Sequence, residues 1–414
     1  MKRFIILLSV TVITLAFCAI LSADGYRGLN SRAAGLGGAY VALGEGSLGA
    51  YYNPACLAGQ KSFDLTIGIT AKLDNYINND MVDDFNDLSD LLKSNNPLTA
   101  ANDYARALVL FNKIQNQVNP APYLVNIEPD VAFGLRFANF GLYAASTNYV
   151  QGSAYLDTVA LNTITNDIHA GTSYIAGVGI AVGEIGIGAG FNLGKLSEPL
   201  KCLDLGLNLK GIGGTSKNIR KSIDKNLDDF AKDDLEVDDI QMDNIEFSAD
   251  LGLRYTSKDG KFIVGLSAKN LTSPKIDSSS ETNGGIVKIK PSARIGICWK
   301  PFERITFVAD ADIIKNKTTI SGIRNDGVYY ANDIESQKAG IGLELRPFNW
   351  KRFDLPFRFG YQFSSSPSNS NDMITAGIGL KFLFIKIDVA AGIQDGMKYE
   401  EREKFINSNI SLFW

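Results

Sequence analysis

The chain has 414 residues, of which 45% are hydrophobic and 21% charged, and its formal net charge is −4. A single histidine leaves little material for general acid–base or zinc chemistry, and the negative charge argues against nucleic acid as a partner. The mean hydropathy of −0.01 is typical of soluble domains. Forty glycines, close to one residue in ten against about 7% usually, do not fit that class.

The N-terminus has the layout of a secretory signal peptide. Two basic residues precede an apolar run over residues 4–21, and the small residue Ala23 follows shortly after it. This pattern predicts a signal peptide over residues 1–23 with cleavage after Ala23. Two alternatives are a lipoprotein modified at Cys18 and a retained membrane anchor. The three later cysteines are too few and too widely spaced for a disulfide framework.

Alternation with period two dominates the chain after residue 60. In residues 63–72 apolar side chains alternate with polar side chains or glycine, and residues 131–137, 245–255 and 406–414 repeat the pattern. Such alternation predicts β-strands. We expect strands near residues 63–73, 129–138, 140–150, 172–182, 185–195, 245–256, 262–270, 291–300, 304–314, 338–347, 354–364, 372–382, 386–394 and 405–414.

The connections between these strands alternate between long and short. The long ones are 74–128, 151–171, 196–244, 271–290, 315–337, 365–371 and 395–404, and short turns, among them Gly183-Glu184, lie between them. Long loops on one rim and tight turns on the other are typical of an outer-membrane barrel, since a sheet that crosses a bilayer must leave no edge unpaired.

We therefore predict an all-β fold, a transmembrane antiparallel β-barrel over residues 62–414, with 14 strands and 16 as the alternative. Leucines at 203, 205, 207 and 209 also alternate. A fifteenth strand would place the two termini on opposite rims, so this stretch is assigned to the 196–244 connection or to an extension of its neighbour.

Several side chains of the predicted barrel have an expected place. Arg136, Arg254 and Arg294 lie in phase with glycine or small polar residues, and we predict that they face the lumen. Trp414 ends the last strand with an aromatic ring, and an aromatic C-terminal residue is the usual recognition signal for the barrel assembly machinery.

Three features lie in the long connections. Helical spacing in residues 79–117 predicts two amphipathic helices that cap the outer rim. Eight carboxylates within residues 224–239 predict a solvated acidic loop, with calcium binding as the alternative, although the order of a known calcium loop is missing. Asp167 and His169 are spaced as in outer-membrane proteases, but the further acidic groups that would activate water cannot be placed.

Residues 24–61 precede the first strand and lack strand alternation. The run from Arg32 to Ala42 is rich in glycine, and the motif Tyr52-Asn53-Pro54-Ala55 follows it. A phosphate-binding loop is a poor interpretation, because no strand precedes the glycines and the sixth-position glycine is missing.

These two motifs resemble the N-terminal hatch of the FadL-like outer-membrane transporters. Later pieces at residues 268–271, 291–301 and 337–348 are similar to the conjugal-transfer TraF-like and PorV-like branch of that group. The resemblance implies a fourteen-strand barrel plugged by the N-terminal segment. The implied hatch or gate residues are Asn53, Pro54, Ala55, Gly35, Gly37 and Gly38.

The resemblance implies a function without catalysis. We expect a channel or binding protein for hydrophobic small molecules in the outer membrane of a Gram-negative-type bacterium, gated by the hatch, with no catalytic residue, cofactor or metal. Its expected partners are outer-membrane lipid, the barrel assembly machinery and a hydrophobic ligand. The TraF-like and PorV-like relatives imply an alternative, a non-transport accessory barrel that works with secretion-system or conjugal-transfer proteins.

Overall fold

The computed structural model describes most of the predicted barrel and the segment before it. The described residues are 28–59, 63–75, 83–84, 87, 105–106, 109–110, 112–113, 125–155, 174–222, 245–277, 285–323, 329–350, 352–365, 372–395 and 404–414. The predicted signal peptide, the pair Asp167 and His169, and the acidic stretch 224–239 lie outside them. Among the described residues, no helix has the length and apolar character needed to cross a membrane.

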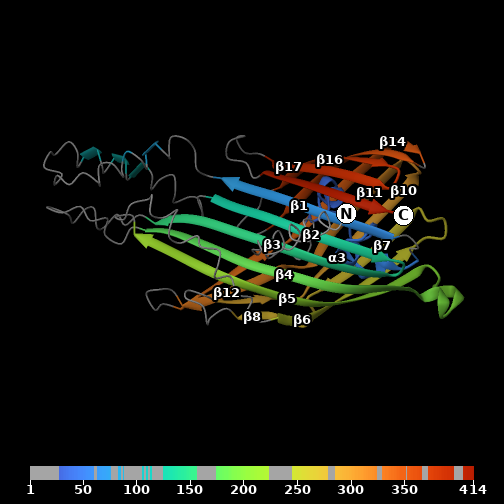
Figure 1. Ribbon diagram of the computed structural model, residues 1–414, viewed down its shortest axis with the longest axis horizontal. Coiled ribbons are helices and arrows are strands. Elements are labelled where there is room, and N and C mark those ends of the chain that lie inside the picture. The colour runs from blue at the N-terminus through green and yellow to red at the C-terminus, as the bar shows by residue number, and fades with distance from the viewer. Residues whose placement is uncertain are drawn as a thin grey trace, which may run out of the picture.

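Fourteen strands form one closed antiparallel barrel, as predicted (Figure 1). In order around the wall they are β1 (Phe63–Asn75), β18 (Lys404–Phe413), β17 (Ile385–Gln394), β16 (Met373–Phe382), β15 (Phe353–Ser364), β14 (Lys338–Trp350), β11 (Ile305–Ile314), β10 (Ser292–Phe302), β7 (Phe262–Lys269), β6 (Ile245–Thr256), β5 (Leu203–Ser222), β4 (Tyr174–Asn192), β3 (Phe140–Tyr155) and β2 (Val125–Phe137). The first strand pairs with the last, so the described ladder has no free edge.

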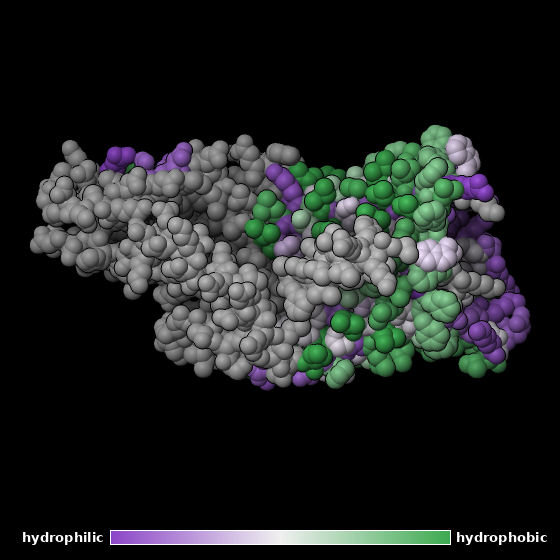
Figure 2. Space-filling model, in the orientation of Figure 1, coloured by the Kyte–Doolittle hydropathy of each residue, from purple (hydrophilic) through white to green (hydrophobic). Residues whose placement is uncertain are grey.

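The period-two pattern separates an inner face from an outer face. Along β10, Arg294 and Cys298 are buried, while the neighbouring Ile295 and Trp299 are 40% and 50% exposed. Other strands repeat this arrangement, and hydrophobic side chains cover much of the described barrel surface on the face seen in Figure 2. The mild mean hydropathy is thus the average of an apolar exterior and a polar interior.

Two of the sequence predictions are wrong, but the number of strands stays at fourteen because the two errors cancel: one strand was predicted as two, and another was predicted as part of a loop. The predicted strands 172–182 and 185–195 are one strand, β4, because Gly183 and Glu184 pair with β3 on one side and β5 on the other and stay extended. The predicted loop 196–244 contains β5, whose leucines point outward with Leu209 60% exposed. The connection between β4 and β5 is the short stretch 193–202, with the turns η2 (Leu193–Lys195) and η3 (Glu198–Leu200).

A second sheet lies beyond the barrel on the long-loop side. Its order is β13 (Tyr329–Ser336), β12 (Asn316–Ile323), β9 (Gly285–Ile289) and β8 (Lys275–Asp277). Since only Lys315 separates β11 from β12, and only Gln337 separates β13 from β14, this sheet continues a barrel hairpin outward. The predicted loops 271–290 and 315–337 are therefore partly wrong, because they contain these four strands.

The described residues of the predicted helical loop are helical. Two ion pairs join its two halves, Arg106 to Asp87 at 2.9 Å and Lys113 to Asp84 at 2.7 Å. The rest of residues 79–117 lies outside the described part, so a cap over the rim stays a prediction.

Candidate functional site

The N-terminal segment, residues 28–59, folds into three short helical turns. They are α2 (Ser31–Gly35), α3 (Gly49–Tyr52) and η1 (Pro54–Leu57). Asn30 begins α2 because its side chain accepts a hydrogen bond from the Arg32 amide, and Asn53 begins η1, with Pro54 at the first position where its missing N–H costs nothing. Most of these residues are buried.

The segment lies in the lumen and contacts the wall on all sides. Glycines on the inner faces of the strands make room for it, because a Cβ at these positions would meet the segment: Gly68, Gly134, Gly141, Gly188, Gly190, Gly206, Gly252, Gly265, Gly296, Gly340, Gly342, Gly360 and Gly377. Strand interiors normally disfavour glycine, which is retained where another backbone approaches closely. The high glycine content therefore reflects the seating of this segment.

The Asn-Pro-Ala motif sits against β5 and β6. Asn53 donates through Nδ2 to the carbonyls of Val41 at 2.9 Å and Leu253 at 3.3 Å, and its Oδ1 accepts from the Ala55 amide at 3.0 Å. Pro54 and Ala55 lie on Gly206 of β5. The motif thus ties the segment both to itself and to the wall.

The predicted glycines lie on the opposite side of the lumen. Gly35 contacts Gly377 of β16, and Gly37 lies against the carbonyls of Ile341 and Tyr361 on β14 and β15. Gly37 and Gly38 have φ of 68° and 82°, a region that glycine adopts without strain. They allow the sharp turn that ends α2.

A buried charge network joins the segment to the wall on that side. Arg32 donates through Nε and Nη2 to the Glu344 carboxylate of β14, both at 2.8 Å. Arg358 of β15 donates to Glu344 at 2.8 Å and to Asp388 of β17 at 2.7 Å. Because their side chains are at most 5% exposed, these charges are well shielded from water.

Glu45 extends this network toward β10. Its carboxylate accepts from Arg32 at 2.6 Å and pairs with Lys300 at 3.1 Å. Burial alone would raise the pKa of Glu45, but the two cations outweigh it and hold that pKa well below its usual range. The Glu45 and Lys300 side chains are 42% and 32% exposed, so solvent reaches the network at this end.

Further polar contacts fix the segment along β11, β16, β17 and β18. Asp310 accepts from the Tyr40 and Val41 amides at 2.7 and 2.8 Å, and Thr375 accepts from the Gly37 amide at 3.1 Å. Ser31 bonds to Asn407, Asn409 and the carbonyl of Asp388.

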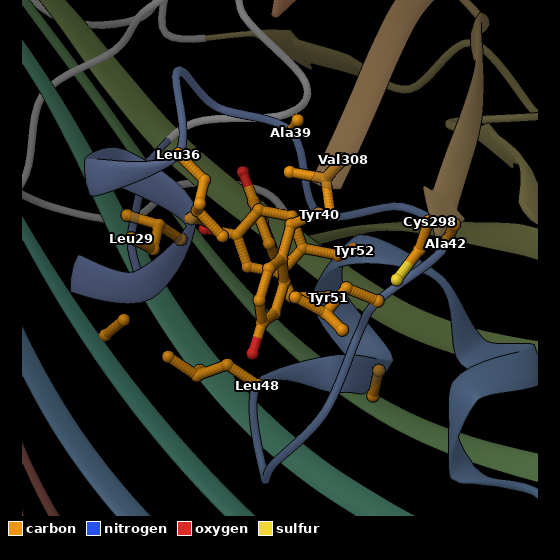
Figure 3. Packing of buried hydrophobic residues seen from close by; sticks show 14 of the residues in the cluster. Leu29, Leu36, Ala39, Tyr40, Ala42, Leu48, Tyr51, Tyr52, Cys298 and Val308 are labelled. Carbon is orange, nitrogen blue, oxygen red and sulfur yellow. The ribbon is translucent and has the colours of Figure 1, made fainter. Parts of the chain in front are cut away.

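Tyrosines form the centre of the segment's core (Figure 3). The rings of Tyr40 and Tyr51 each contact Tyr52 edge to face, with centroids 5.0 and 5.1 Å apart, and Tyr51 contacts Tyr143 of β3 at 5.7 Å. The ammonium of Lys269 lies 3.4 Å from the centroid of the Tyr51 ring.

The three arginines predicted for the lumen are on the wall beside carboxylates. Arg254 pairs with Asp204 at 2.9 Å and Arg294 with Asp312 at 2.6 Å. Arg136 is buried, and its partner residue across the β1–β2 ladder is Asp64.

The terminal Trp414 closes the ladder. Its ring stacks on Phe63 with centroids 4.3 Å apart, and the two residues exchange backbone hydrogen bonds. The residue is 68% exposed and lies at the rim of the short turns.

Cys56, Cys202 and Cys298 form no disulfide among the residues that the structure describes. Burial raises the pKa of Cys56 to about 11. The described residues contain no group of three or more side chains suited to hold a metal ion.

A family model described as "F plasmid transfer operon, TraF, protein" matches residues 50–312, more than half of the chain. The chain belongs to this TraF family. The match agrees with the conjugal-transfer resemblance of the sequence analysis, and it spans the Asn-Pro-Ala motif and the wall from β1 to β11. No curated protein matches the chain significantly.

Solved structures with a similar barrel are distant in sequence. The toluene transporter TodX of Pseudomonas putida is 12% identical, with 95% of this chain and 99% of TodX covered and a TM-score of 0.49. A FadL homologue of Pseudomonas aeruginosa is 10% identical, with 96% and 99% covered and a TM-score of 0.47. CdiB of Acinetobacter baumannii is 8% identical, with 86% and 60% covered and a TM-score of 0.31. At these values the activities of those proteins do not transfer to this TraF-family chain.

Proposed function

We propose that this TraF-family protein is an outer-membrane channel for hydrophobic small molecules, and that the N-terminal segment closes its lumen as a hatch. The observation that supports the proposal is the seating of residues 28–59, which lie in the lumen and contact inward glycines around the wall. The segment is held by non-covalent contacts, and the described cysteines form no disulfide. A plug held in this way is suited to reversible displacement.

The exterior supports a place in the outer membrane. A strand of ten residues tilted by about 40° spans the roughly 25 Å apolar band of such membranes. Exposed aromatic rings mark the short-turn rim, among them Phe137, Phe302, Trp350, Phe384 and Trp414, where an aromatic girdle meets the headgroups. Outer-membrane lipid and, through Trp414, the barrel assembly machinery are the partners that follow.

Deleting residues 28–59 tests the hatch. We expect the full-length protein to have a low ion conductance in a planar bilayer, and the deletion variant to have a higher one because its lumen is open. Retained heat-modifiable mobility on gels shows that the barrel still assembles. An assembled deletion variant with unchanged conductance would show that the segment is no gate.

The hydrophobic solute class needs a separate measurement. Cells with a lipopolysaccharide outer leaflet exclude apolar molecules, so uptake of labelled toluene by cells with and without the protein reports the channel. Faster uptake of a polar sugar but not of toluene would contradict the proposed hydrophobic solute, while the proposal of a gated channel would stand.

A second function is favoured by the family match. Its description names a plasmid transfer operon, which suits an accessory barrel of a secretion or conjugal-transfer system. Stable co-purification with proteins of such a system, together with no uptake of any solute, would favour this role over transport.

A further inference from the structure

The contacts of the N-terminal segment with the wall differ between two sides of the lumen. On the side formed by β10, β11 and β14 to β18, charged or amide side chains hold it, with Arg32 on Glu344, the Tyr40 and Val41 amides on Asp310, and Ser31 on Asn409. Hydrogen bonds to ionised groups are roughly twice as strong as neutral ones. An apolar solute offers nothing that replaces them.

On the side formed by β3, β4 and β5 the segment meets a wall of glycine. A Cβ built at Gly188 would lie 3.1 Å from the Ala50 Cβ and 3.2 Å from the Leu57 Cδ1, and one at Gly141 would lie 3.2 and 3.1 Å from the same two side chains. Positions without a side chain cannot hold the segment by side-chain hydrogen bonds. The contact between these alkyl groups and the wall is apolar, and an apolar molecule can replace it.

The polar side chains of β3 to β6 nearest this contact bond to one another within the wall, whereas the turn between β2 and β3 contacts the end of the segment through Asn139, whose Oδ1 accepts from the Gly59 amide at 3.2 Å. Asn208 of β5 donates through Nδ2 to the Tyr143 hydroxyl at 2.9 Å and to Asp250 at 2.8 Å. Lys210 pairs with Glu184 at 3.0 Å and with Asp250 at 3.1 Å. This network belongs to β3 to β6, so it stays intact when the segment moves away.

We propose that the segment stays fixed to β10, β11 and β14–β18 and parts from β3–β5, and that solutes pass between Ala50, Leu57 and the glycine wall. This inference rests on the proposed function and adds the route to it. Movement on this side exchanges apolar contacts for contacts with the solute, whereas movement on the other side would strip the buried Glu344 of its Arg32 partner, a costly step.

An unused acceptor on the route indicates the chemistry of the solute. Asn208 is fully buried, and its Oδ1 accepts no hydrogen bond from the residues that the structure describes. That oxygen lies 3.6 Å from the same built Cβ at Gly188 that Ala50 and Leu57 approach, so it borders the contact that parts. A buried acceptor gains from a donor, and the solute assigned to this route is therefore an apolar molecule with one hydroxyl or N–H group.

Engineered disulfides test which side of the segment moves, because each can lock the segment to one side of the lumen. They are introduced into a variant whose native cysteines are replaced by alanine. Ala50→Cys with Gly188→Cys links the segment to the glycine wall, and Gly35→Cys with Gly377→Cys, where a Cβ at Gly35 lies 3.2 Å from the Gly377 Cα, links it to β16. The Cβ atoms of the first pair lie 3.1 Å apart, slightly closer than the roughly 3.5–4.5 Å of a disulfide, and in the second pair each built Cβ lies 3.2–3.4 Å from the Cα of the other residue. If the second pair fails to assemble, Ser31→Cys with Asn409→Cys replaces it.

Uptake of labelled p-cresol is measured for each pair, oxidised and then reduced. We expect the Ala50–Gly188 link to abolish uptake and reduction to restore it, while the link to β16 leaves uptake within about twofold of the reduced protein. Loss of uptake in both linked proteins, in neither, or only with the β16 link would overturn the route. If the reduced proteins take up no more than cells without the protein, the proposed channel function itself fails.

The solute class is tested by the ratio of p-cresol to toluene uptake. Asn208→Leu removes the acceptor, and we expect it to lower this ratio by about two- to tenfold, the range that one hydrogen bond confers. Gel mobility and toluene uptake show that the variant barrel still works. An unchanged ratio in a working barrel would overturn the assignment of a donor-bearing solute.

Discussion

Replacing Arg32 with alanine should release the N-terminal segment without unfolding the barrel. The side chain gives Glu344 two charge-assisted hydrogen bonds at 2.8 Å, and the two side chains are 5% and 0% exposed. Removing one partner of a buried pair typically costs about 3–5 kcal/mol. Glu344 keeps Arg358 at 2.8 Å and Arg346 at 3.3 Å, so the cost should fall to about 2–3 kcal/mol, or roughly a 30- to 150-fold rise in segment opening.

Hydrogen exchange of peptides from residues 28–59 measures this opening, since exchange from a locally open state scales with its population. Lys210→Met is the matched control. Lys210 is buried and paired with Glu184 and Asp250, but both partners are on the wall, so its loss should leave exchange of the segment unchanged. Unchanged exchange in the Arg32 variant, or an equal rise in both variants, would refute the assignment of Arg32 as the anchor.

Three further outcomes follow from the same contacts. Gly206→Val should block the seat of the Asn-Pro-Ala turn and raise ion conductance of the assembled barrel, whereas Gly211→Val, whose Cβ meets only a wall side chain at 3.2 Å, should not. Although burial would raise it, the pKa of the Glu45 carboxyl is lowered in the folded protein by neighbouring cations. The stabilisation by its negative charge is therefore complete above the pKa in the unfolded chain, about 4.3, and is lost as the pH falls through the pKa in the folded protein. Protease cleavage of the segment should stay constant from pH 8 to about 5 and rise below about pH 4, and Glu45→Gln should remove that rise. Since burial raises the pKa of Cys56 to about 11, its alkylation at pH 8 should be slow and should accelerate in the Arg32 variant; equal rates would show that the thiol is reached without release.

The barrel could be predicted from the sequence because each strand carries its own signal. Outward side chains must be apolar and inward ones need not be, so period two is visible in every segment, and the parity of the rims fixes an even count. The boundary between β4 and β5 was missed because a glycine followed by a charged residue marks a turn only when the ladders stop there. At Gly183 and Glu184 both ladders continue, and only pairing between distant strands reveals this.

The anchor of the segment could not be predicted in the same way. Arg32, Glu344 and Arg358 are up to 326 positions apart in a chain of 414, and nothing local marks them as partners. The period-two pattern of β14 and β15 predicts that Glu344 and Arg358 point inward. Which of the inward charges contacts the segment depends on where the closed barrel positions the segment.

The glycines of the wall make the barrel and its segment depend on each other. Glycine in a strand interior loses conformational entropy and packs no side chain, so a wall with many inward glycines would be a weak sheet on its own. Closure supplies a complete ladder, and the segment supplies the atoms that the missing side chains do not. A side chain added at Gly188 or Gly206 would strengthen the strand locally but would occupy the space of Ala50 or Pro54. The sequence therefore keeps a weaker strand where the segment must approach, which explains why the glycine count exceeds what turns alone would require.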